Sequence, residues 1–152
     1  MTYRSIFAAI FLISSCSNAT DGGICSIPKT NELRKQNQIP ISYERLAEQH
    51  PGREILPVLT QRIEDWGCMP QGHSFLYGVE TDYPGVSIPS YLKERHQNEI
   101  WIILEFEFEQ VSDGKFGMAL TLQFDGKAET LIIPYESIFR FVDENANFDI
   151  SF

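Results

Sequence analysis

Apolar and acidic residues alternate along residues 100–111, and this pattern restricts the fold of the chain more than any other. The even-numbered positions are apolar: Ile100, Ile102, Leu104, Phe106 and Phe108. Three odd-numbered positions are acidic: Glu105, Glu107 and Glu109. A period of two predicts a strand with one buried face and one solvated face. We therefore interpret the glutamates as a solvated face, and not as carboxylates paired for acid–base catalysis.

Two Asp-Gly pairs divide the sequence that follows into strands. Asp113-Gly114 and Asp125-Gly126 are typical of hairpin turns. Alternating apolar residues lie between them: Met118, Leu120, Leu122 and Phe124. Shorter strands are predicted over residues 75–80, 130–133, 139–142 and 148–152.

The predicted helices lie mainly before the strands. Residues 42–50 are predicted to form a short helix, and residues 53–66 a longer one in which Ile55, Leu59 and Ile63 recur at helical spacing. Residues 90–96 predict one further helical turn. The expected fold is therefore α+β, with an N-terminal helix followed by a strongly bent antiparallel β barrel or sandwich.

The N-terminus has the pattern of an export signal. Arg4 precedes an apolar run at residues 6–13 that is shorter than the roughly 20 residues a membrane-spanning helix needs. The run ends in Ile13-Ser14-Ser15-Cys16, which resembles a bacterial lipobox, where cleavage falls before the cysteine and its thiol receives a diacylglycerol. Residues 1–15 are thus predicted to be a lipoprotein signal peptide, Cys16 the lipidated residue and the polar residues 16–40 a flexible tether. The alternative is a stray cysteine after an N-terminal apolar helix.

The other two cysteines, Cys25 and Cys68, are candidates for a disulfide in an exported protein. The alternative is two unrelated thiols. A metal site is not expected, because the sequence has no Cys-x-x-Cys and no histidine at ligand-like spacing to either cysteine. His73 and His96 are interpreted as surface histidines, and no cofactor is predicted.

Composition limits the class of function. The chain of 152 residues is 43% hydrophobic, so residues 41–152 can form one domain with a single core. A formal net charge of −9 repels phosphate backbones, so nucleic acid is not an expected partner. The sequence has no nucleophile elbow, Gly-rich phosphate loop or metal motif. We therefore predict that the protein is not an enzyme.

Residues 53–152 resemble the SspB family, the adaptor proteins that deliver tagged substrates to the ClpXP protease, and its alphaproteobacterial branch in particular. The resemblance is carried by Pro84-Gly85-Val86 and Ile88-Pro89 after a Phe-rich strand, and by the aliphatic-Pro-Tyr corner at Pro134. It implies a Sm-like topology, a homodimer through the helix at residues 53–66, and a groove that binds an extended peptide or protein segment.

The resemblance also implies where that groove lies, around residues 122–126 and 135–141. The candidate peptide-binding residues are Gln123, Phe124, Gly126, Ser137, Phe139 and Phe141. Gln123 and Ser137 offer hydrogen bonds to a peptide backbone, and the phenylalanines offer apolar pockets for alternate side chains. Phe124 and Phe141 are equally compatible with ordinary core positions.

Three features depart from the family pattern. Family adaptors continue into an acidic linker and a tail that grips the unfoldase, whereas this sequence stops at Phe152, and residues 105–109 replace a Gln-His-Gln-Phe-Trp run. The lipobox also implies a compartment without ClpXP. The interpretation is a peptide-binding lipoprotein that faces the periplasm, with the outer membrane favoured by Ser17 after the cysteine. The alternatives are a cytoplasmic ClpXP adaptor-like specificity factor and a structural envelope lipoprotein without a working groove.

Overall fold

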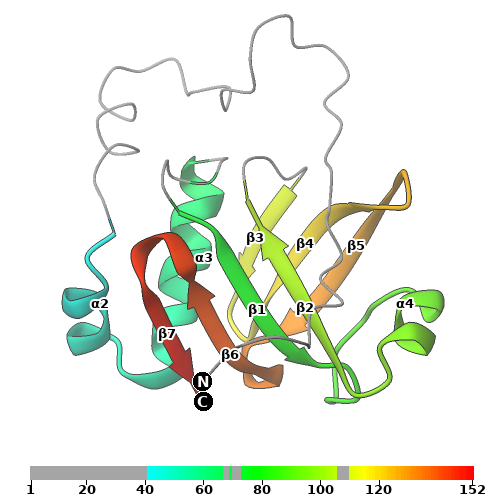
Figure 1. Ribbon diagram of the computed structural model, residues 1–152, viewed down its shortest axis with the longest axis horizontal. Coiled ribbons are helices and arrows are strands. Elements are labelled where there is room, and N and C mark those ends of the chain that lie inside the picture. The colour runs from blue at the N-terminus through cyan, green and yellow to red at the C-terminus, as the bar shows by residue number, and fades with distance from the viewer. Residues whose placement is uncertain (1–40, 67–68, 70–72, 106–109) are drawn as a thin grey trace, which may run out of the picture.

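The strands of the protein form two separate antiparallel sheets, accompanied by a few helices (Figure 1). The computed structural model describes residues 41–66, 69, 73–105 and 110–152. One sheet has the strand order β2-β1-β6-β7 and the other has the order β3-β4-β5; we call them the four-stranded and the three-stranded sheet. The α+β class is confirmed. The barrel alternative is wrong, because the two sheets do not join and each keeps two edge strands. The Sm-like topology stays a prediction.

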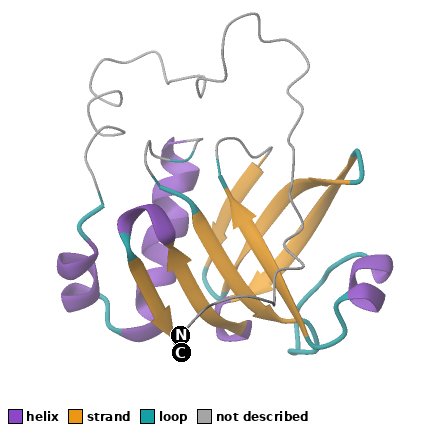
Figure 2. Cartoon of the chain, viewed as in Figure 1, coloured by secondary structure: helices purple, strands orange, loops and turns teal. Residues whose placement is uncertain are grey.

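The element bounds agree with most of the predicted ones (Figure 2). The four-stranded sheet contains β1 (Phe75–Glu80), β2 (Glu99–Leu104), β6 (Ile138–Asp143) and β7 (Phe148–Ser151). The three-stranded sheet contains β3 (Gln110–Gly114), β4 (Gly117–Phe124) and β5 (Lys127–Pro134). The α-helices within the described residues are α2 (Tyr43–Gln49), α3 (Ile55–Trp66) and α4 (Ser90–Arg95). The same residues contain the short 3-10 helices η1 (Gly52–Glu54), η2 (Tyr135–Ser137) and η3 (Glu144–Ala146).

The helix α3 buries the apolar stripe that its sequence predicts. Ile55, Leu59 and Ile63 are fully buried. Pro57 lies in the first turn, where its missing N–H removes no helical hydrogen bond. The helix packs beside β3, which is an edge strand of the three-stranded sheet (Figure 1).

The predicted strand over residues 100–111 is wrong as a single element. Its first half forms β2 in the four-stranded sheet and its end belongs to β3 in the other sheet. The predicted core residues Phe106 and Phe108 lie outside the described residues. Leu104 and Val111 are only 1% and 6% exposed. These two residues are seven positions apart along the chain, an odd number, so one regular strand would place them on opposite faces. The chain therefore changes sheets between them.

The two predicted hairpins are present, with one turn displaced. Asp125 and Gly126 form the β4–β5 turn with φ angles of 50° and 78°, as a type I′ turn requires. In the β3–β4 hairpin Gly114 pairs with Gly117, so Asp113-Gly114 ends the strand and the next two residues form the turn. The predicted alternation in β4 is confirmed, because its even-numbered residues are all buried.

A cluster of aromatic rings fills the inner face of the four-stranded sheet. The ring of Phe141 on β6 lies 5.1 Å from that of Phe75 and 5.3 Å from that of Tyr77, measured between centroids. Tyr43 of α2 stacks on Phe148 of β7 at 4.1 Å. Phe141 is therefore a core residue that joins β6 to β1.

We expect Phe141→Ala to lower the free energy of unfolding by about 3–5 kcal/mol, because it removes a fully buried ring. Phe116→Ala is the control: this side chain is 75% exposed, and we expect a change below about 0.5 kcal/mol. Urea unfolding followed by circular dichroism measures both. Equal losses would contradict the assignment of Phe141 to the core.

Candidate functional site

The residues predicted around the β4–β5 turn do not all face the same way. Phe124 points into the core and is 3% exposed, so it offers no pocket for a ligand. Gln123 is half-buried on the outer face of the three-stranded sheet, opposite Ala128 of β5. Gly126 is exposed, and the space where a Cβ would stand has no atom within 4 Å. Gln123 and Gly126 are thus the accessible members of this group.

The residues predicted after Pro134 are mostly interior. Ser137 is 1% exposed, and its Oγ donates a hydrogen bond to the Pro134 carbonyl at 2.6 Å. Phe141 lies in the core, as described above. Phe139 is the exception, because its ring is half-exposed and lies against Trp101 of β2 at 5.5 Å. Neither Ser137 nor Phe141 can contact a ligand without a rearrangement of the core.

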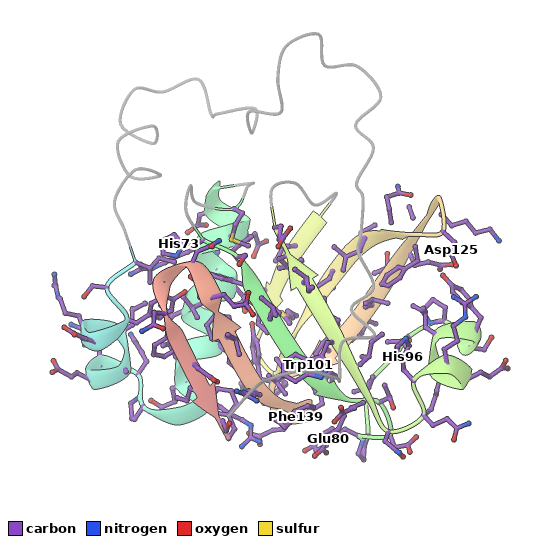
Figure 3. The ribbon with its side chains drawn as sticks, in the orientation of Figure 1. His73, Glu80, His96, Trp101, Asp125 and Phe139 are labelled. Carbon is purple, nitrogen blue, oxygen red and sulfur yellow. The ribbon has the colours of Figure 1, made fainter. Side chains whose placement is uncertain are left out.

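The structure does not bring the two predicted parts of the groove together. The register of the β4–β5 hairpin pairs Phe124 with Lys127 at one end and Gly117 with Pro134 at the other. These ends are seven residue steps apart along β4, about 23 Å at about 3.3 Å per residue. Figure 3 shows the same separation, with Asp125 far from Phe139. The accessible residues Gln123 and Gly126 therefore have to be considered apart from Phe139.

The outer edge of β5 is the part of the hairpin that is open to a backbone partner. The connector after β1 pairs with it at one position: Ser87 N–H donates to the Ile132 carbonyl at 3.0 Å, and Ile132 N–H donates to the Ser87 carbonyl at 2.9 Å. Because outward backbone groups alternate along a strand, those of Ala128 and Thr130 point to this same edge. Within the described part of the chain no backbone group pairs with them there. Both residues are exposed, and Ala128 lies beside Gln123.

Sequence reasoning missed a buried cluster around Asp143. The Asp143 carboxylate, fully buried at the end of β6, accepts a hydrogen bond from the Tyr43 hydroxyl at 2.6 Å and lies 2.5 Å from Nδ1 of His73. Ser74 N–H also donates to it, at 3.3 Å. The side chain of His73 is only 6% exposed, so its interpretation as a surface histidine is wrong.

An aspartate beside a histidine invites a catalytic interpretation, but the geometry favours a structural one. Nε2 of His73 accepts a hydrogen bond from the Ile41 N–H at 3.4 Å, so Nδ1 carries the proton that Asp143 accepts. Both ring nitrogens are then occupied by the protein itself, and neither can act as a base. The cluster joins α2, the start of β1 and the end of β6.

The environments of Asp143, Tyr43 and His96 change their ionisation. Burial by itself would raise the pKa of Asp143, but the hydrogen bonds from His73, Tyr43 and Ser74 N–H outweigh it and hold the pKa below its usual value. Burial, together with the bond to Asp143, raises the pKa of Tyr43 far above its usual value, so this hydroxyl stays a donor. His96 is half-buried after α4, and burial and the charge of Arg95 lower its pKa.

Cys16, Cys25 and Cys68 lie outside the described residues. Among the residues that the structure describes, no three His, Cys, Asp or Glu side chains are grouped to hold a metal ion. No helix within that same part is long and apolar enough to cross a bilayer.

We expect the stability supplied by Asp143 to depend on pH. Its folded pKa lies below the unfolded value of about 3.9, so its contribution is complete above that pH and is lost as the pH falls through the folded pKa. Asp143→Asn should lower the free energy of unfolding by about 2–3 kcal/mol at pH 7, because hydrogen bonds to a charged acceptor are lost. This loss should shrink between pH 4 and pH 2, where the carboxylate of the unchanged protein becomes protonated.

Urea unfolding midpoints at pH 7, 4 and 2 measure this dependence. Asp82→Asn is the control, since its ion pair with Lys93 is exposed and should contribute less than about 1 kcal/mol. A cost of Asp143→Asn that stays constant down to pH 2 would contradict the assignment.

The comparison with known protein families gives a match over most of the described chain. The family model for stringent starvation protein B, SspB, matches residues 52–152, which is roughly two thirds of the chain. The matched part begins at η1 and contains α3, α4 and both sheets. No curated protein matches the chain.

Proposed function

Because the chain belongs to the SspB family, we propose that it is a non-enzymatic specificity factor that binds an extended segment of a client protein. The family is one of adaptors, so a ClpXP adaptor-like role fits the match better than a role tied to a membrane anchor. The proposed client segment is a peptide similar to a degradation tag, and the proposed receiver is a protease of the ClpXP kind.

The observation that carries this proposal is the outer edge of β5. An extended peptide binds a sheet edge through main-chain hydrogen bonds, which give affinity without demanding one sequence. Ala128 and Thr130 offer outward N–H and C=O groups for such bonds. Gly126 allows a second backbone to approach closely, and Gln123 lies on the neighbouring strand with both donor and acceptor atoms.

The other predicted groove residues act indirectly in this proposal. Phe124 packs into the core and so fixes β4 in place. Ser137 is hydrogen-bonded to the Pro134 carbonyl at the corner after β5, and the buried ring of Phe141 fixes β6.

The predicted dimer through the helix at residues 53–66 also belongs to the proposal. The outward residues of α3 include Gln61, Glu64 and Asp65, so such a dimer would bury mainly polar side chains.

The test is a random-peptide display screen on the full-length protein, followed by titration of a selected peptide. We expect a dissociation constant of micromolar order. Ala128→Pro removes an outward N–H without breaking a β4–β5 bond, and should weaken binding about tenfold. Ala128→Val keeps the N–H and should bind as the unchanged protein does.

Three outcomes decide between the candidate functions. Faster degradation of a peptide-tagged reporter by ClpXP in the presence of the protein would support the adaptor role. If both Ala128 variants bind the selected peptide equally, the binding site is not the β5 edge. If no peptide binds, the protein is better described as a structural member of the family without a working groove.

We also propose a location. Ile13-Ser14-Ser15-Cys16 favours a lipid anchor and a periplasmic site at the outer membrane, and because that compartment lacks ClpXP, this location is the alternative to the adaptor role proposed above. Cys16→Ala should leave the precursor uncleaved and remove incorporated palmitate, which metabolic labelling and membrane fractionation measure. Unlabelled wild-type protein in the soluble cytosolic fraction would contradict the anchor and favour the cytoplasmic adaptor.

A further inference from the structure

The outer face of the four-stranded sheet carries two aromatic rings around a glycine. Gly78 of β1 pairs with Trp101 of β2, and the ring of Phe139 from β6 lies across the glycine. A Cβ on Gly78 would stand 2.6 Å from Cζ of Phe139, so only glycine leaves room for the ring. The Trp101 and Phe139 rings are half-exposed and meet edge to face at an interplanar angle of 85°.

Two carboxylates lie directly beside these rings. Glu80 pairs with Glu99 on the same outer face, one same-face step along the strands from Gly78 and Trp101. Both glutamates are exposed, and like charges directly opposite each other on a sheet face destabilise it. Figure 3 shows Glu80, Trp101 and Phe139 close together at one end of the sheet.

The glutamate pair differs from the acidic residues around it. Asp82 has Lys93 as a partner, Glu136 has Arg53, and Asp149 has Arg140. Glu80 and Glu99 have no basic partner anywhere in residues 41–66, 73–105 and 110–152. No basic side chain of the described residues therefore neutralises this exposed pair, which leaves both carboxylates open to a cation from a partner.

The spacing of rings and carboxylates suits one kind of side chain. Same-face neighbours on a strand are about 7 Å apart, which the stem of a lysine or arginine can span. The apolar stem can lie over the aromatic rings while the cation at its end reaches the carboxylates, close enough to a ring to be attracted by its face. An acidic protein of net charge −9 also attracts a basic partner over longer distances.

We propose that Glu80, Glu99, Trp101 and Phe139 form a surface, here called the cation face, that docks a lysine- or arginine-bearing extended segment of a partner protein. It lies on a different sheet from the β5 edge and does not depend on peptide binding there. The protein would then hold two segments at once, one by its backbone at β5 and one by its basic side chains at the cation face.

The experiment uses the full-length protein and a fluorescein-labelled peptide, Ser-Lys-Val-Lys-Val-Lys-Ser, with fluorescence anisotropy as the readout. A second peptide has glutamine in place of each lysine. We expect the lysine peptide to bind about tenfold more tightly than the glutamine peptide at low salt, with a smaller difference at high salt.

Matched variants separate the cation face from general charge attraction. The double variant Glu80→Gln/Glu99→Gln should weaken binding of the lysine peptide about fivefold, and Trp101→Leu should weaken it severalfold. The double variant Glu44→Gln/Glu94→Gln changes net charge equally at exposed sites on α2 and α4, and should change binding less than about twofold. The Glu80/Glu99 variant removes a repulsion, so its unfolding midpoint should not fall.

Each contrary result overturns the proposal. Equal binding of the lysine and glutamine peptides would show that the protein does not recognise the charge of the peptide. Equal weakening by the Glu44/Glu94 control would show general attraction only, and no binding at millimolar peptide would show no docking surface. Loss of lysine-peptide binding in Ala128→Pro would place that peptide at the β5 edge instead, whereas failure of peptide binding at β5 alone leaves the cation face intact.

Discussion

A fully buried carboxylate, that of Asp143, ties the N-terminal helix α2 to the four-stranded sheet. It accepts hydrogen bonds from the Tyr43 hydroxyl, from His73 and from the backbone N–H groups of Ser74 and Ala146. Several donors around one carboxylate offset the loss of its hydration, which would otherwise exclude it from the interior. The ring of Tyr43 stacks on Phe148 while its hydroxyl reaches Asp143, so the polar and the apolar contacts of α2 hold it in the same place. The positions of α2, η3 and β7 therefore all depend on the end of β6.

Local patterns predicted much of this fold. The alternation in β4 and the Asp125-Gly126 turn need only neighbouring residues, and both are present as predicted. The change of sheet after β2 could also have been predicted, because the buried apolar residues change from an even-numbered position at Leu104 to an odd-numbered one at Val111. The burial of His73 could not, since its partner Asp143 lies 70 positions away in the sequence.

The candidate site was less predictable than the fold because a ligand depends on which way each side chain faces. Phe124 continues the buried alternation of β4, so its inward direction was readable from the sequence. The burial of both Ile138 and Phe141 was not, because they are three positions apart and a regular strand would place them on opposite faces. The β1–β6 register shifts between Gly78 and Val79, and this bulge leaves both Phe139 and Arg140 half-exposed. A family resemblance located these segments along the chain but did not determine their facing.

The bridge between Ser87 and Ile132 has a consequence for how the protein meets other copies of itself. A sheet edge that is open along its whole length can pair with the same edge of a second molecule, and such pairing can continue into aggregates. Ser87 already occupies the position beside Ile132, so a strand that joins β5 has to stop before it. The connector therefore shortens the open edge to a few residues near the β4–β5 turn. That length admits a short foreign segment but is too short for two β5 strands to pair along their full extent.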